Sequence, residues 1–81
     1  MRCTILLFAQ ARDVVGCDRL TIELNAMATA GDALNRMVRE HPALAALNDR
    51  LALAVNERYA TKATPLTDGC VIALIPPVSG G

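Results

Sequence analysis

The stretch CVIALIPPVSGG, from Cys70 to Gly81, decides how this chain can fold. Its first six residues are apolar at both alternating sets of positions, a pattern typical of a central strand covered on both faces. Pro76 and Pro77 cannot donate backbone hydrogen bonds, so the sheet must end there. A second run of this kind, CTILLF, occupies residues 3–8. We therefore expect these two strands to pair at the centre of one sheet.

A capped helix and weaker strands fill the sequence between the central strands. Residues 20–24 alternate between apolar and polar side chains, which predicts a half-buried strand paired in a hairpin with the first. Thr29 and Asp32 form a capping-box pattern at the start of a helix, and Pro42 ends that helix at His41. The other segments read as a turn at 12–19, a helical turn at 43–47, a strand at 51–55, a turn at 57–58, a short extension at 59–61 and a turn at 64–69.

The resulting order, ββαββ, predicts an α+β fold with one main helix on one face of the sheet. Leu6 and Phe8 lie at alternate positions to Ile5 and Leu7, so the second face is apolar as well. Either residues 43–50 with the loops or a partner protein must cover that face, and the residues alone leave both possibilities open. We expect a folded body over residues 1–75 and an extended tail over 76–81.

Composition excludes several classes of protein. A chain of 81 residues forms one domain, and its 8 basic side chains equal its 8 acidic ones, which predicts no binding of nucleic acid or of an anionic membrane. No segment approaches the ~18 apolar residues of a membrane span, and the first apolar run is shorter than the ~7–15 residues of a secretory signal core. Three cysteines without CxxC spacing argue against a disulfide framework and a zinc site. We expect a reducing, cytoplasmic location.

The side chains offer no catalytic set. Cys3 and Cys70 lie in apolar strand runs and read as inert small hydrophobes, while Cys17 lies in a turn with no adjacent base or cationic group to activate it. His41 is at a helix end, and the scattered carboxylates form no buried pair. There is no phosphate-binding glycine loop. We expect no bound metal and no bound cofactor.

The tail is the remaining candidate. Frayed termini are commonly polar or charged, whereas this uncharged tail follows directly on a buried strand. Prolines favour extended geometry and project the chain, and terminal glycines can thread a channel in which any Cβ would clash. We interpret Gly81 as carrying a reactive carboxyl group into another protein's active site. The tail residues that deliver it are Pro76, Pro77, Val78, Ser79 and Gly80.

Four stretches make the chain resemble the small sulfur-carrier subunits of molybdopterin synthase, a family of ubiquitin-like β-grasp proteins. They are LLFAQARD from Leu6, AVN from Ala54, PLTDG from Pro65 and PPVSGG from Pro76. The resemblance implies a mixed β-grasp sheet with a flexible Gly-Gly tail. It also implies partner contacts at Phe8, Arg12, Tyr59 and Ile75. The chain departs from the family at Cys70 and Val71, which stand where members commonly carry an acidic pair.

The resemblance implies a role in molybdenum cofactor biosynthesis. An E1-like enzyme would adenylate the Gly81 carboxyl with ATP, and a sulfur donor protein would convert it to a thiocarboxylate. The tail would then enter the large subunit, whose residues catalyse sulfur transfer to cyclic pyranopterin monophosphate. The chain itself would be a non-catalytic subunit of a heterotetramer, with two small subunits flanking a dimer of large ones.

Three alternatives share parts of this pattern. The chain could be a sulfur carrier for thiamine thiazole or another sulfur product, or a ubiquitin-like modifier that is joined to target lysines. It could also be a structural binding domain whose tail has no role. The starting stretch LLFAQAR and the ending PPVSGG favour the molybdopterin synthase reading.

Overall fold

The computed structural model describes residues 1–77. The predictions for Val78, Ser79, Gly80 and Gly81 lie outside the described residues. The elements are, in chain order, β1 (Arg2–Leu7), α1 (Ala9–Val15), β2 (Arg19–Glu23), α2 (Ala30–Glu40), the short 3-10 helices η1 (Pro42–Ala46) and η2 (Asn48–Arg50), β3 (Ala52–Val55), β4 (Arg58–Ala60) and β5 (Val71–Ile75).

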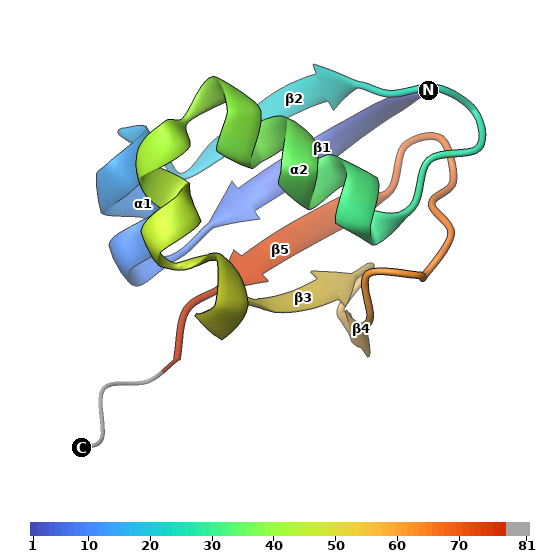
Figure 1. The fold of residues 1–81 in the computed structure, drawn as a ribbon. Coiled ribbons are helices and arrows are strands. Elements are labelled where there is room, and N and C mark those ends of the chain that lie inside the picture. Colours follow the sequence, from blue (N-terminus) through green and yellow to red (C-terminus); the bar gives the residue numbers. More distant parts are fainter. Residues whose placement is uncertain (78–81) are drawn as a thin grey trace.

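The strands form one mixed sheet in the order β2-β1-β5-β3-β4. β1 and β5 pair in parallel at its centre, from Thr4 opposite Val71 to Leu7 opposite Leu74. All other neighbouring strands are antiparallel. The predicted central pairing of the first and last apolar runs is therefore confirmed, and in Figure 1 the arrows of β1 and β5 point the same way.

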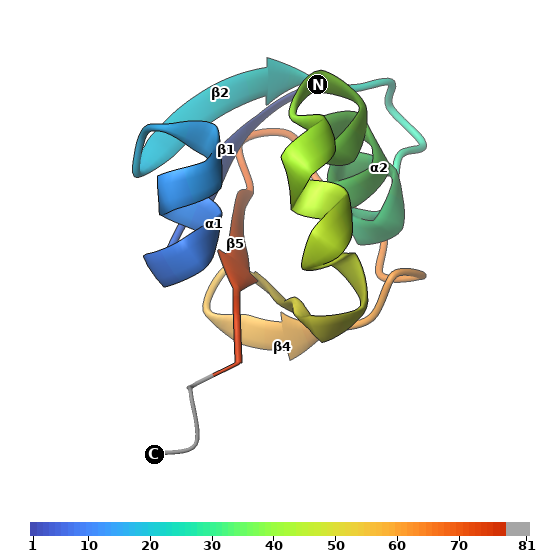
Figure 2. The same cartoon turned by 60° about the vertical axis from the view of Figure 1, so that its left-hand side comes forward.

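One face of the sheet carries the core. Ile5 and Leu7 of β1 and Ile72 and Leu74 of β5 are almost completely buried there. The opposing residues come from α2 and η1, namely Leu34, Met37 and Leu44. Figures 1 and 2 show α2 lying across this face and α1 beside the end where β1 and β5 finish. The core is aliphatic because the chain has only two aromatic side chains, Phe8 and Tyr59.

The start of α2 is fixed by the predicted capping box. The Thr29 hydroxyl accepts a hydrogen bond from the backbone N–H of Asp32 at 3.3 Å, and the Asp32 carboxylate accepts one from the N–H of Thr29 at 2.8 Å. Two of the otherwise unpaired amide groups at the helix start are satisfied in this way. The helix ends at His41 before Pro42, as the sequence predicts.

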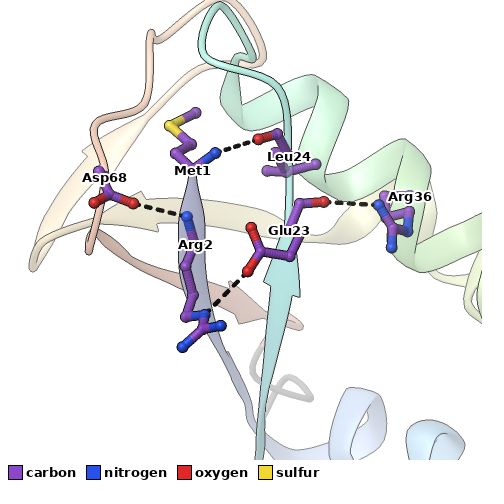
Figure 3. Close-up of polar contacts among 6 residues, drawn as sticks. All are labelled: Met1, Arg2, Glu23, Leu24, Arg36 and Asp68. Atoms are coloured by element: carbon purple, nitrogen blue, oxygen red, sulfur yellow. Dashed lines mark hydrogen bonds and ion pairs between the residues drawn. The ribbon is translucent and has the colours of Figure 1, made fainter.

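Polar contacts connect the elements around the start of β1 and the end of β2 (Figure 3). The backbone N–H of Arg2 donates to Asp68, and its guanidinium donates to the carboxylate of Glu23 at 3.0 Å. Arg36 of α2 donates to the backbone carbonyl of Glu23 at 2.8 Å. The exposed Arg2–Glu23 ion pair contributes little by itself, but together these contacts tie β1, β2, α2 and the turn before β5 to one another.

Two local predictions are wrong. Residues 12–19 are not all turn, because α1 extends to Val15 and the chain turns only at Gly16, whose φ of 93° ends the helix in the left-handed region. The turn predicted at 57–58 is at Asn56 and Glu57, and Arg58 already belongs to β4. The order ββαββ is present once α1, the 3-10 helices and β4 are set aside.

Gly31, in the first turn of α2, allows a close contact with the loop before β5. Its backbone N–H donates to the Lys62 carbonyl at 2.8 Å. The N–H of Ala30 likewise donates to the Thr64 carbonyl at 2.8 Å. A Cβ at position 31 would lie 2.9 Å from both the Cβ and the carbonyl oxygen of Lys62. Only glycine fits there without moving the loop.

We therefore predict that Gly31→Ala destabilises the protein by about 1–3 kcal/mol, as overpacking typically does. The sign is informative, because in a helix interior without this contact alanine would be favoured over glycine by about 1 kcal/mol. Asn35→Ala, at an exposed position of the same helix, is the control and should be neutral or slightly stabilising. Urea unfolding of both variants measures the change, and a stabilised Gly31→Ala would contradict the contact.

Candidate functional site

The face of the sheet opposite the helices has no covering element among residues 1–77. Side chains alternate along each strand, so Leu6, Val71, Ala73 and Ile75 point away from the core. The possibility that residues 43–50 cover this face is wrong, because η1 contacts α1 and α2 on the helical side. This part of the sheet is the open face of the molecule.

A groove of about 480 Å³ lies on the open face. Its lining is mostly apolar and comes from the three strands β1, β5 and β3, from Phe8 after β1, and from the β3–β4 hairpin. Phe8 is 46% exposed and Tyr59 is 83% exposed, although large apolar side chains are normally buried. Contiguous exposed apolar surface of this kind marks an interaction site.

Strand register defines the floor of the groove. Leu6 lies opposite Ala73, Ala73 opposite Ala54, and Ala54 opposite Tyr59, so these four residues form one row across the sheet. The two alanines are in the middle and the two large side chains are at the ends. The row is therefore hollow at its centre and raised at both ends.

Asn56 connects the hairpin to the central strand. Asn56 and Glu57 both have positive φ, 50° and 70°, which is the geometry of a two-residue hairpin turn that favours Asn. The N–H of Asn56 donates to the Val71 carbonyl at 2.8 Å, and its side-chain oxygen accepts from the N–H of Val71 at 2.9 Å. This double contact gives a physical reason for Asn in the AVN stretch, and it places Glu57 and Tyr59 beside the groove.

The structure brings together three of the four residues predicted as partner contacts. Phe8, Tyr59 and Ile75 all line the groove, whereas Arg12 is exposed on α1 and is not part of its lining. Phe8 keeps extended backbone geometry, with φ −119° and ψ 150°, and so continues the alternation of β1 toward the open face. The assignment of these residues to a partner stays a prediction.

The groove ends where the tail begins. Ile75, the last residue of β5, lines the groove, while Pro76 is buried and Pro77 is exposed. The chain therefore leaves the packed body at Pro77, at the end of the sheet opposite the N-terminus (Figure 1). Sequence reasoning identified Ile75 but missed Ala54, Ala73 and Glu57 as groove residues. The alternation that placed Leu6 on this face also applies to Ala73.

The cysteines have different environments. Cys3 and Cys70 are buried neighbours, with their sulfur atoms 3.4 Å apart, whereas Cys17 is half-buried. Burial, together with the hydrogen bond from Cys70, raises the pKa of the Cys3 thiol to about 11. The reading of Cys3 and Cys70 as small core residues fits this geometry. The departure from the family pattern thus places Cys70 in the core and Val71 in the groove.

Other side chains of residues 1–77 add no reactive cluster. His41 caps the end of α2. No group of three or more potential metal ligands lies together in this described part. Across the same residues, none of the helices combines the length and apolar character needed to cross a membrane.

Comparison with known proteins identifies the family. The model of the ThiS family matches residues 5–81, nearly the whole chain. This chain belongs to the ThiS family. A relative from Chlamydomonas reinhardtii, a molybdopterin synthase sulfur carrier subunit, is 36% identical over 83 aligned residues that span all of both proteins.

Two solved structures share the fold of this ThiS-family chain. Small archaeal modifier protein SAMP1 from Haloferax volcanii superposes with a TM-score of 0.90 at 31% identity, covering both chains completely. A complex of subunits 1 and 2 of molybdopterin-converting factor from Helicobacter pylori contains a chain with a TM-score of 0.71 at 28% identity, also covering both chains completely. The predicted β-grasp fold is confirmed.

The cysteine environments predict unequal alkylation. At pH 8, with a pKa of about 11, only on the order of one Cys3 thiol in a thousand is ionised. Because a raised pKa favours the neutral thiol, reactivity at Cys3 should increase only as the pH approaches 11. At pH 8 we expect iodoacetamide to label Cys17 first and the buried pair only after unfolding. Mass spectrometry of the wild type and of Cys17→Ser measures this, and equal rates at all three thiols would contradict it.

Proposed function

We propose that this ThiS-family chain is the sulfur-carrier subunit of a molybdopterin synthase. The observation that carries the proposal is the apolar groove on the open face, which runs to the root of the tail at Ile75. A partner that seats on the groove also receives the tail. The sulfur carrier from Chlamydomonas reinhardtii and the two-subunit complex from Helicobacter pylori support this choice among ThiS-family roles.

The proposed chemistry uses the main-chain carboxyl of Gly81. A carboxylate is a poor acyl donor, so an E1-like enzyme first joins it to AMP from ATP with release of pyrophosphate. A sulfur donor protein then supplies sulfide-level sulfur, which attacks the acyl carbon. A C–S bond forms, the bond to AMP breaks, and the product is a thiocarboxylate in which sulfur is the nucleophile. In the large subunit this sulfur is transferred to cyclic pyranopterin monophosphate. The chain contributes the sulfur and its delivery, and the partner's residues catalyse the transfer.

The environment of the chain follows from the same proposal. The free cysteines fit a reducing cytoplasm. The carrier binds no cofactor of its own, because ATP is consumed at the activating enzyme. The docked assembly is a heterotetramer with two carriers on a dimer of large subunits.

A ubiquitin-like modifier is the second candidate, favoured by the likeness to the Haloferax volcanii protein named as a modifier. In that role the activated Gly81 carboxyl forms an amide with a lysine of a target. Stable conjugates of high mass in cell extracts would distinguish it from a carrier. A carrier for thiamine thiazole would instead co-purify with a different partner.

Activation of Gly81 should change the mass of the chain. Incubation with its E1-like enzyme, ATP and a sulfur donor should increase the intact mass by the difference between one sulfur and one oxygen atom. Deletion of Gly81, or addition of one residue after it, should abolish both this increase and sulfur transfer. Circular dichroism should show the variants folded. Sulfur transfer by the shortened chain would exclude the carboxyl of Gly81 as the reactive group.

Substitution of Phe8 tests the docking face. Phe8→Arg places a charge on apolar surface that the partner would desolvate, so association with the large subunit should weaken by about 2 kcal/mol or more, at least about 30-fold in Kd. Met27→Arg is the matched control, because Met27 is 87% exposed and lies outside the groove. Calorimetric titration measures both, and equal affinities would show that the groove is not the docking face.

A further inference from the structure

The floor of the groove contains side chains that are smaller than the fold would accommodate. Ala54 and Ala73 occupy the centre of the row that begins with Leu6 and ends with Tyr59. Ala54 is only 8% exposed, yet it is not part of the contiguous core. It is therefore hidden by the walls of the groove rather than by packing against the helical side.

Local preference does not explain these alanines. Strands favour β-branched and aromatic residues, and alanine is depleted in them. β5 follows this preference at Val71, Ile72 and Ile75 but departs from it at Ala73. On the open face, no element among residues 1–77 packs over Ala73 and limits the size of its side chain. A position that breaks a local rule without a structural reason is typical of a functional surface.

The chemistry of the lining indicates what fits the hollow. The groove wall is apolar around the alanines, and the side-chain oxygen of Asn56 is already engaged by the N–H of Val71. Glu57 is the one charged side chain of the lining, and it belongs to the hairpin at one side. A polar small molecule would find too few convergent hydrogen-bond groups here. An apolar protein side chain would find an apolar floor at Ala54 and Ala73, with Leu6 and Tyr59 at the two ends of the row.

We infer that the hollow over Ala54 and Ala73 receives one large apolar side chain of the large subunit, and that these alanines determine which partner fits. The inference rests on the proposed function, since it names the contact by which the carrier's partner is chosen. A partner that takes the tail lies next to the groove, because Ile75 both ends β5 and lines the groove. An apolar anchor in a desolvated pocket is the usual centre of an interface.

Ala73→Leu tests the inference by filling the hollow. Leucine is compatible with a strand, and the variant should keep the thermal stability of the wild type. Its affinity for the large subunit should fall at least about tenfold, because the anchor is excluded. Thr21→Leu is the matched control. Thr21 pairs with Thr4 on the same face of the sheet, is exposed and lies outside the groove, so its affinity should be unchanged.

A compensating change identifies the anchor. Each large apolar residue on the contact surface of the large subunit is replaced by alanine and titrated with the wild-type carrier and with Ala73→Leu. One replacement should weaken binding of the wild type and restore binding of the variant, as coupled residues do in a double-mutant cycle. If no replacement restores binding, the hollow has no single anchor and the inference is wrong.

The outcomes separate this inference from the proposed function. Full affinity of Ala73→Leu together with weak binding of Phe8→Arg would leave the docking face in place and overturn the hollow. Full affinity of both variants would overturn the docking face itself. If Ala73→Leu does not fold, Ala73→Val replaces it with a smaller side chain that suits a strand. The gain in mass at Gly81 is measured without the large subunit, so it is independent of the affinities of these variants.

Discussion

The parallel pairing of β1 with β5 is the constraint on which the rest of the structure depends. It joins the first and last strands of the described chain, so the segment between them must cross from one end of the sheet to the other. Within that segment the helix α2 connects β2 to β3, which run in the same direction, and it buries the face that holds Ile5 and Ile72. Because β5 is central, its end emerges between β1 and β3, beside the groove.

The sequence predicts the parts of the fold that have local causes. Apolar runs at both sets of positions marked β1 and β5, and Thr29 with Asp32 marked the start of α2. The helix α1 was missed because Phe8 provides no side-chain cap, only Ala11 is buried, and Gly16 favours a turn. The floor of the groove was missed because it depends on register, which brings Ala54 and Ala73 together from separate strands.

The two faces of the sheet differ in how much apolar surface they bury. A domain this small buries a modest share of its surface, so the helical face must supply most of the stabilisation. Its packing leaves the thiols of Cys3 and Cys70 in contact. The open face keeps Phe8 and Tyr59 exposed at the expense of further burial. Substitutions on this face should accordingly affect association more than folding.

The burial of Pro76 has a consequence for the rate of the proposed transfer. With Pro76 held in the packed body, only the residues from Pro77 onward connect the docked domain to the carboxyl of Gly81. Five residues reach at most about 18 Å when extended. A short tether gives its end a high effective concentration near the point of attachment, commonly in the millimolar range. In the proposed function, affinity at the groove would thereby be converted into local concentration of the sulfur at the partner's active site.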